Sequence, residues 1–123
     1  MAKKILFVED EMALHKTLGE FLKQEGYEVS DAMDGEVGLK MAKEEKPDLI
    51  LLDLVLPKLH GFEVLKALKG DPETEDIPVI VLTNLEATAD IEKALEMGAT
   101  TYLVKATYSL EEVVGKIKKT LGE

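Results

Sequence analysis

The chain has 123 residues, enough for one domain with a sizeable core, and 46% of them are hydrophobic, which argues against disorder. It has no cysteine, so disulfides, thiol nucleophiles and zinc–thiolate sites are excluded, and an intracellular setting fits. The net charge is −10, from 25 acidic and 15 basic residues, and all the basic residues are lysines. Direct binding to nucleic acid or to an anionic membrane is therefore disfavoured, and guanidinium clamps on phosphate are excluded.

No segment of the sequence has the pattern of an export signal or of a membrane span. The apolar run near the N-terminus, ILFV within MAKKILFVEDE, is too short for a signal peptide. No stretch approaches the ~20 apolar residues that cross a bilayer. We therefore expect a soluble, cytoplasmic protein.

Short apolar segments alternate with helical patterns along the chain. Strands are expected where apolar and β-branched residues run together, and helices where apolar residues recur every three or four positions. Gly26 and Gly98 follow two of these helices, Pro47 stops another, and Ser109 opens the last with the spacing of a capping box. The expected elements, in chain order, are strand 3–8, helix 11–26, strand 27–32, helix 35–46, strand 48–52, helix 61–70, strand 77–83, helix 87–98, strand 100–104 and a helix from Ser109.

Each helix is expected to turn an apolar stripe toward the sheet. For the first, fourth and last helices the inward residues should be Leu14, Leu18, Phe21 and Leu22; Ile91, Ala94 and Leu95; and Leu110, Val114, Ile117 and Leu121. His15 lies beside Lys16 on a lysine-rich face, so we expect its ring to be solvated. The acidic loop 70–76 should be a solvated connection.

Five strand–helix units without a second domain, linker or repeat indicate an α/β protein. Continuously apolar strands separated by helices predict a parallel sheet covered on both faces. The common order for such a doubly wound (βα)5, flavodoxin-like sheet is 2-1-3-4-5, with the topological switch between strands one and three. Ligands bind beyond the carboxyl ends of the strands at that switch.

Polar residues follow the carboxyl ends of four of the expected strands. They are Glu9 and Asp10 after the first strand, Asp53 in LLDLVLP after the third, Thr83 as the last residue of the fourth and Lys105 after the fifth. Three neighbouring carboxylates stay charged together only when a cation is bound; otherwise one pKa rises. All-oxygen ligands favour a hard cation such as Mg²⁺. The expected ligands are Asp10, Asp53, Glu9 through a water, and a backbone carbonyl near Val55.

A carboxylate beside Mg²⁺ and a lysine can act as a nucleophile toward a phosphoryl group and form an aspartyl-phosphate. Asp53 is the expected nucleophile, because its strand lies between the first and the fourth. Lys105 would stabilise charge on a phosphoryl oxygen. The groups expected to complete the cradle are the Thr83 hydroxyl and the backbone amides of Leu54, Val55 and Asn84.

Over essentially its whole length the chain resembles a response-regulator receiver domain. The matching residues are the pair Glu9-Asp10, Asp53 in LLDLVLP, Gly61, Thr83 after IPVIVL, GA at 98–99 and YLVK at 102–105. The resemblance implies a single receiver domain over residues 1–123. The chain is similar to stand-alone receivers, such as the chemotaxis response regulator or phosphorelay intermediates.

The resemblance further implies that a histidine kinase or histidine phosphotransferase passes a phosphoryl group to Asp53, with Mg²⁺. Thr83 would then move toward the phosphoryl group and Tyr102 would swing inward. The face of the fourth helix, fifth strand and fifth helix would change and meet a downstream protein target. The chain would catalyse its own phosphorylation and slow self-dephosphorylation, without turning over a separate substrate.

Four residues depart from the family pattern: Leu56 replaces a methionine, His60 an aspartate or asparagine, Asn84 a small residue, and Ala106 a proline that follows a cis peptide bond. None of them removes a charged site residue. A cis bond before alanine costs ~2.5–4 kcal/mol, so we expect a trans Lys105–Ala106 bond.

Val55 and Leu85 stand two residues beyond Asp53 and Thr83. They should flank the approach of the water that hydrolyses an acyl phosphate. Neither side chain can orient a water, so we expect slow loss of the phosphoryl group.

Three rival interpretations share parts of this pattern. A flavodoxin-like cofactor carrier would need a phosphate-friendly loop after the first strand, where EDEMA is acidic. A haloacid-dehalogenase-like phosphatase normally has a second aspartate two residues after the nucleophile, where this chain has Val55. A nonphosphorylated pseudo-receiver that acts as a binding module is the strongest rival, and the intact Asp10, Asp53, Thr83 and Lys105 argue against it.

Overall fold

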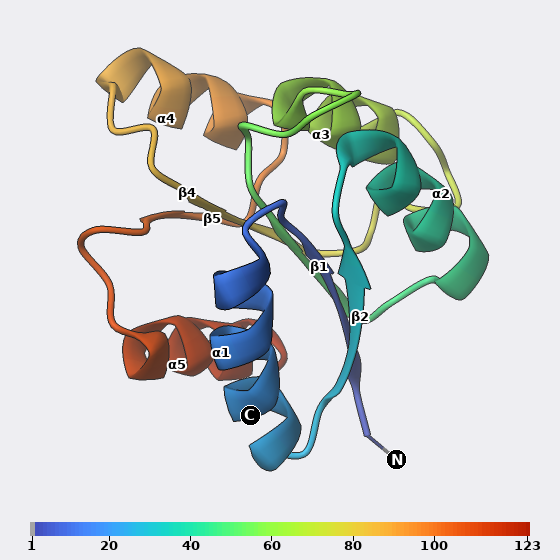
Figure 1. The fold of residues 1–123 in the computed structure, drawn as a ribbon. Coiled ribbons are helices and arrows are strands. Elements are labelled where there is room, and N and C mark those ends of the chain that lie inside the picture. The colour runs from blue at the N-terminus through green and yellow to red at the C-terminus, as the bar shows by residue number, and fades with distance from the viewer. Residues whose placement is uncertain (1) are drawn as a thin grey trace.

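The computed structural model describes residues 2–123, which form one parallel sheet between two layers of helices (Figure 1). In chain order the elements are β1 (Lys4–Val8), α1 (Met12–Gln24), β2 (Glu28–Ala32), α2 (Gly35–Glu45), β3 (Leu49–Leu52), α3 (Gly61–Lys69), β4 (Val79–Thr83), α4 (Thr88–Glu96), β5 (Thr101–Val104) and α5 (Leu110–Thr120). Every expected strand and helix is confirmed, with its ends within two residues of the expected positions. Within residues 2–123, no helix combines the length and the apolar character needed to cross a membrane.

The sheet has the expected order, β2-β1-β3-β4-β5, and every pairing is parallel. β1 lies between β2 and β3, so the chain turns first to one side of β1 and then to the other. The carboxyl ends of β1 and β3 flank this switch, which is where ligands bind in doubly wound sheets. The flavodoxin-like fold class is therefore confirmed.

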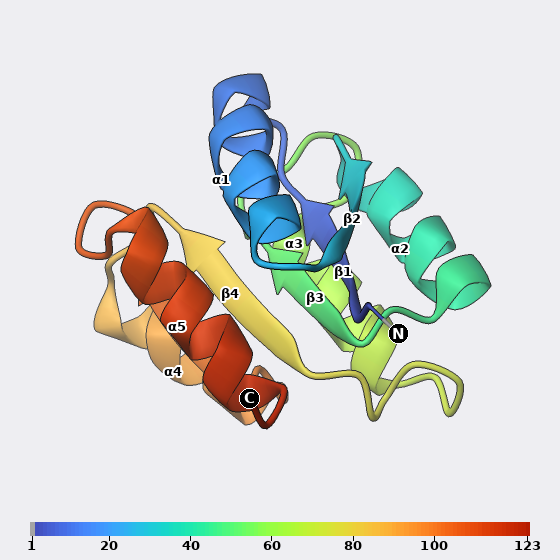
Figure 2. The same ribbon diagram turned by 90° about the horizontal axis from the view of Figure 1, so that it is seen from below.

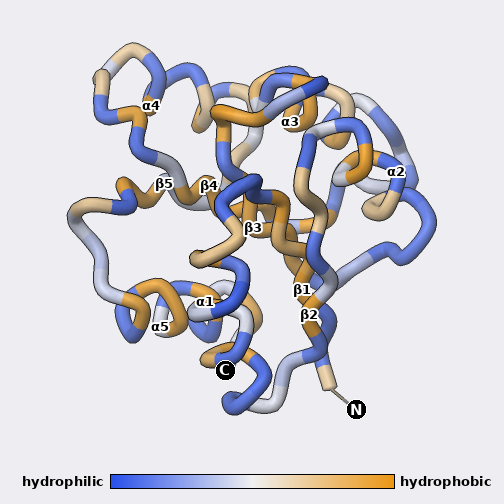
Figure 3. The backbone as a smooth tube through the Cα atoms, viewed as in Figure 1, coloured by the Kyte–Doolittle hydropathy of each residue, from blue (hydrophilic) through white to orange (hydrophobic). Residues whose placement is uncertain are grey.

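Alternate residues of each strand enter two separate cores. Leu6 and Val8 of β1 pack under α2, α3 and α4, whereas Ile5 and Phe7 pack under α1 and α5. Figure 2 shows the two helical layers on opposite faces of the sheet. Figure 3 shows that hydrophobic residues are concentrated in the central strands and hydrophilic residues in the outer loops. Burial on both faces explains why the strands read as continuous apolar runs.

The inward stripe expected for α4 is wrong at one position. Ala94 is fully buried, but the Leu95 side chain is 46% exposed. α4 covers the β4–β5 end of the sheet; Ala94 is its one buried residue, and the expected Ile91 is half-buried. In α5, Val113 is buried together with the expected Val114 and Ile117.

Gly61 allows α3 to begin directly against the segment that follows β3. A Cβ at this position would lie 2.3 Å from Leu54 Cα and 2.5 Å from the Asp53 carbonyl oxygen. The Gly61 amide donates a hydrogen bond to the Leu54 carbonyl at 2.9 Å. The start of α3 therefore fixes the backbone around Asp53.

Candidate functional site

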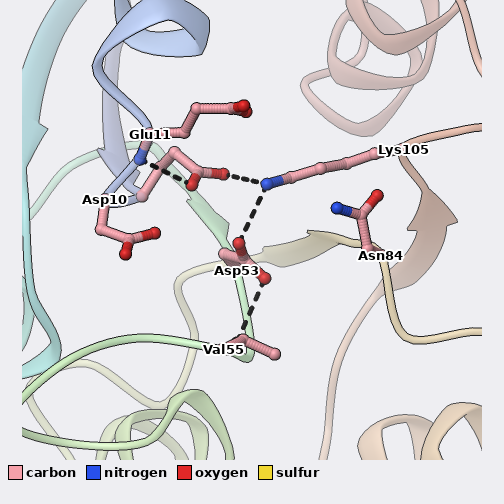
Figure 4. A pocket seen from close by; sticks show the side chains of 7 residues that line it. Asp10, Glu11, Asp53, Val55, Asn84 and Lys105 are labelled. Carbon is pink, nitrogen blue, oxygen red and sulfur yellow. Dashed lines mark hydrogen bonds and ion pairs between the residues drawn. The ribbon is translucent and has the colours of Figure 1, made fainter.

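A cleft of about 290 Å³ opens at the carboxyl ends of β1 and β3, where the topology predicts a ligand site (Figure 4). Its lining residues are Glu9, Asp10, Glu11, Asp53, Val55, Asn84 and Lys105. The acidic pair, the central aspartate and the lysine expected from the sequence therefore meet in one place. They come from three different strand ends.

Asp53 is held directly after β3 with its carboxylate in the cleft. Its backbone amide donates to the Val8 carbonyl of β1 at 3.0 Å, and its side chain is almost fully buried. Oδ1 accepts a hydrogen bond from the Val55 amide at 3.2 Å, and Oδ2 accepts one from Lys105 Nζ at 3.0 Å. Each carboxylate oxygen thus has a donor, which offsets the cost of burying this charge in an apolar run.

Lys105 follows β5, and its backbone amide donates to the Thr83 carbonyl at 2.8 Å. Its ammonium lies between two carboxylates, 2.6 Å from Glu9 Oε1. The second is Asp53 Oδ2 at 3.0 Å, and this contact is marked in Figure 4. Burial lowers the pKa of Lys105, but its contacts with Glu9 and Asp53 more than offset this, so the pKa is raised overall. The side chain is therefore a fixed positive charge at neutral pH.

Glu9 is fully buried at the base of the cleft. Its Oε2 accepts a hydrogen bond from the Glu11 amide at 3.0 Å. Burial raises the pKa of Glu9 and the charge of Asp53 raises it further, and these effects exceed the opposing contacts with Lys105 and the Glu11 amide. Among the residues that line the cleft, the carboxyl groups outnumber the single lysine.

Carboxylate oxygens of Glu9, Asp10 and Asp53 lie within 4.8 Å of one another. Apart from the Lys105 ammonium, Glu9 Oε1 has no hydrogen-bond donor among residues 2–123. The donor set consists of oxygens, and it has an excess of negative charge. The residues present therefore fit a hard divalent cation such as Mg²⁺.

Thr83 and Tyr102 do not line the cleft. Thr83 is fully buried, and its Oγ1 accepts a hydrogen bond from the Leu85 amide at 3.5 Å. The Tyr102 hydroxyl donates to the Leu85 carbonyl at 2.8 Å. Burial raises the pKa of Tyr102, with smaller contributions from the charges of Asp90 and Asp53. Both proposed switch residues are thus bound to the same residue of the β4–α4 loop.

The backbone amides expected to complete the phosphoryl cradle belong to residues that differ in their position relative to the cleft. The Val55 amide points at Asp53, and the exposed Asn84 lines the cleft. Leu54 is fully buried, and its carbonyl accepts from Gly61. Val55 also lines the cleft, with its side chain 52% exposed, whereas Leu85 is half-buried against the core and does not line it.

The expectation that His15 is solvated is wrong. The residue is only 7% exposed, and its ring packs 4.6 Å from the ring of Phe7. Position 15 shares one face of α1 with Leu18 and Leu22, three and seven residues further on. That spacing is visible in the sequence and places the ring toward the sheet.

His60 caps α3, because its Nδ1 accepts a hydrogen bond from the Phe62 amide at 3.3 Å. The departure from the family pattern at this position therefore keeps an N-terminal cap. Every peptide bond within residues 2–123 is trans, as expected for Lys105–Ala106.

Residues 5–118 match the family described as the response regulator receiver domain. Over 105 residues the chain is 45% identical to the response regulator PleD of Caulobacter vibrioides, a match that covers 85% of this chain and 23% of PleD. Over 121 residues it is 43% identical to PhoP, the alkaline phosphatase synthesis transcriptional regulatory protein of Bacillus subtilis, covering 98% of this chain and 49% of PhoP. The chain thus spans less than half the length of these curated relatives.

Solved structures with the same fold support this relationship. A CheY-like response regulator receiver domain protein from Methanospirillum hungatei superposes with a TM-score of 0.92 at 29% identity, covering 99% of this chain and 95% of that one. The receiver domain of the sensor histidine kinase PA1611 from Pseudomonas aeruginosa, which has a magnesium ion coordinated in its active site cleft, gives 0.89 at 27% identity over 100% of both chains. Because the family match runs through all five strands and nearly all of α5, we conclude that this chain belongs to the response regulator receiver domains of two-component signalling, for which a phosphoacceptor role is typical.

Proposed function

We propose that Asp53 of this chain receives a phosphoryl group from the phosphohistidine of a histidine kinase or histidine phosphotransferase. The proposal is carried by one observation, a buried carboxylate bound between an ammonium and a backbone amide in an acidic cleft. An Asp53 oxygen attacks phosphorus, the phosphorus–nitrogen bond breaks, and its electron pair returns to the imidazole of the donor. The other ring nitrogen of the phosphohistidine carries a proton before the transfer, so the products are an acyl phosphate on Asp53 and a neutral histidine on the partner.

Catalysis of this transfer depends on position and charge, because a loose phosphoryl transition state needs little covalent help. The Lys105 ammonium already forms an ion pair with Asp53, and it would remain beside the phosphoryl oxygens after transfer. The amides of Leu54, Val55 and Asn84 and the Thr83 hydroxyl are the remaining proposed donors. Asp10, Asp53, Glu9 through a water, and the Val55 carbonyl would hold Mg²⁺, which supplies positive charge beside the transferred group.

The signal would leave through the β4–α4 loop. The Thr83 hydroxyl and the Tyr102 hydroxyl both bind the Leu85 backbone, so a movement of Thr83 toward a phosphoryl group disturbs the Tyr102 contact. The surface that would change consists of α4, β5 and α5, and it includes the exposed Leu95. A downstream protein target is proposed to read this surface.

Phosphorylation is tested by incubating the protein with a histidine kinase and ATP and mapping the product after borohydride trapping. We expect one acid-stable, base-labile acyl phosphate on Asp53, and none in Asp53→Asn. Labelling that persists in Asp53→Ala contradicts the assignment. If the wild type takes up no label from a range of kinases, the pseudo-receiver alternative is favoured.

Magnesium binding is tested separately by calorimetry on the unphosphorylated protein. We expect weak binding that is strongly reduced in Asp53→Asn and in Asp10→Asn, because each substitution removes one of the clustered carboxylates. Unchanged binding in Asp53→Asn refutes this ligand set. Glu44→Gln on the outer surface of α2 is a matched control that should bind like the wild type.

A further inference from the structure

Glu9 is tied to its surroundings at both backbone groups. Its amide donates to the Ala32 carbonyl of β2 at 3.0 Å. Its carbonyl lies one residue beyond the end of β1 and accepts a hydrogen bond from His15 Nε2 on α1. Since a carbonyl can only accept, Nε2 carries the hydrogen of this bond. A side chain of α1 therefore fixes the peptide unit that joins Glu9 to Asp10.

The His15 ring is itself held by two further elements. Nδ1 lies 2.7 Å from Asp31 Oδ1 on β2, and the ring packs on Phe7 of β1. Phe7 and Asp31 are register partners across the β1–β2 pair. A buried ring with a polar partner at each nitrogen has little freedom to rotate, so it is a rigid support for the Glu9 carbonyl.

This support matters most for Asp10. Its side chain is exposed at the rim of the cleft, and no hydrogen bond or ion pair within residues 2–123 fixes it. The orientation of Asp10 therefore depends on the backbone on either side. On one side that backbone is the Glu9 peptide bound by His15, and on the other it is the Glu11 amide bound to Glu9 Oε2.

We propose that His15 is a positioning residue, which fixes the Glu9 carbonyl and thereby aims the Glu9-Asp10 pair into the cleft. It touches neither the phosphoryl group nor the cation. Groups that orient ligands from one layer further out typically change metal affinity by about 10- to 100-fold when they are removed. The part of the inference that concerns Mg²⁺ rests on the proposed function, whereas the part that concerns the backbone of the unliganded protein does not.

Two substitutions of His15 test the contacts of its two ring nitrogens one at a time. In His15→Gln the amide nitrogen falls near the position of Nε2, so the donor to the Glu9 carbonyl is kept and the Asp31 contact is lost. In His15→Asn the polar group falls near Nδ1, so the Asp31 contact is kept and the donor to Glu9 is lost. Leu18→Val, on the same face of α1, loosens the packing of that helix without touching Glu9 and controls for general destabilisation.

Three quantities are measured for each variant: the Mg²⁺ dissociation constant by calorimetry, the amide NMR shifts of Asp10 and Glu11 without Mg²⁺, and the urea midpoint. We expect roughly tenfold weaker Mg²⁺ binding in His15→Asn, with near-normal binding in His15→Gln and Leu18→Val. The two amides should shift in His15→Asn and stay close to wild type in the other two. Wild-type affinity in His15→Asn, or equal losses in all three variants, overturns the proposal.

A wild type that binds no Mg²⁺ would refute the proposed metal site on its own account. The amide shifts then decide the role of His15. Shifts confined to His15→Asn support the proposal, and shifts of equal size in His15→Asn and His15→Gln overturn it.

Discussion

At the scale of single residues, the cleft is a place where charge is unbalanced. Glu9, Asp10 and Asp53 contribute three carboxylates, and Lys105 is the one ammonium among the lining residues. The ammonium divides its contacts between Glu9 and Asp53, so it serves both buried carboxylates at once. Removing the ammonium should therefore lower the stability of the protein, whereas removing one of the carboxylates should raise it.

We predict that Lys105→Met destabilises the unphosphorylated protein, because two carboxylates then remain without their partner. Breaking a buried ion pair costs about 3–5 kcal/mol, and an open cleft reduces this to the lower end of that range or less. Added Mg²⁺ should return part of the loss. Urea unfolding with and without Mg²⁺ measures both effects, with the exposed Lys116→Met as a control that should stay within about 0.5 kcal/mol. Equal stability of the two variants would show that the buried pair is not what the lysine provides.

We predict that Val55→Asn shortens the lifetime of the acyl phosphate severalfold. The Val55 side chain is exposed in the cleft and cannot hydrogen-bond to a water, whereas an asparagine can orient one. Leu85, which we expected to act with it, does not line the cleft, so Leu85→Glu alone should change the decay much less. The decay of purified phosphoprotein is followed for each variant. If Val55→Asn decays no faster than the wild type, the inability of Val55 to orient a water is not what sets the lifetime.

The sequence was sufficient to place Glu9, Asp10, Asp53 and Lys105 together, because parallel strands converge at their carboxyl ends. It was not sufficient to place side chains whose direction depends on a loop. Thr83 follows the same rule as Asp53, yet its hydroxyl is bound to the Leu85 amide and does not line the cleft. The spacing of residues fixes which strand end they follow, but hydrogen bonds within the loops decide where they point.

At the scale of elements, α3 and α4 differ in how they are attached. α3 buries Phe62, Val64, Leu65 and Leu68, whereas α4 buries Ala94. The two helices also meet where Lys93 Nζ lies 4.3 Å from the centre of the Phe62 ring. The helical period overstated the buried stripe of α4, because a helix at the end of a sheet has less surface to cover.

We predict that Gly61→Ala destabilises the protein by about 1–3 kcal/mol, the usual cost of forcing an extra methyl group into a filled site. The new Cβ would meet the backbone of Asp53 and Leu54, which cannot move without shifting the phosphoacceptor. Phosphorylation of Asp53 should therefore slow as well. Urea unfolding and the rate of labelling are the measurements.

Gly115→Ala is the matched control for this substitution. Gly115 lies inside α5, and a Cβ there would meet nothing within 4 Å. Alanine in an open helical position is favoured over glycine by about 1 kcal/mol, so this variant should be more stable than the wild type. Similar losses in both variants would mean that the close approach at Gly61 has no special effect.

At the scale of the whole molecule, contacts of α5 and the residues after it close the end of the fold opposite the cleft. Lys3 Nζ donates to the Leu121 carbonyl at 3.2 Å, and Lys118 forms an ion pair with Glu25. The Tyr27 hydroxyl donates to Glu123 Oε1 at 2.5 Å. These contacts join α5 to the starts of β1 and β2, and they were not predictable because no periodic pattern links residues that are so far apart in sequence.

We predict that the Tyr27 contact makes the protein sensitive to alkaline pH. Burial raises the pKa of Tyr27, and the hydrogen bond to Glu123 raises it further above the ordinary value of about 10. Since the folded pKa exceeds the unfolded one, the stabilisation is fully present below pH ~10 and is lost as the pH rises toward the folded pKa, at up to about 1.4 kcal/mol per pH unit.

At pH 7 Tyr27→Phe should be less stable by about 1 kcal/mol, the net value of one hydrogen bond. The difference should close near pH ~11, because the unfolded wild type ionises there and the variant cannot. Urea unfolding at pH 7, 9 and 11 measures it, with Tyr108→Phe as a control whose hydroxyl makes no hydrogen bond within residues 2–123. A constant difference between Tyr27→Phe and the wild type from pH 7 to 11 would show that the bond to Glu123 does not hold this end of the fold.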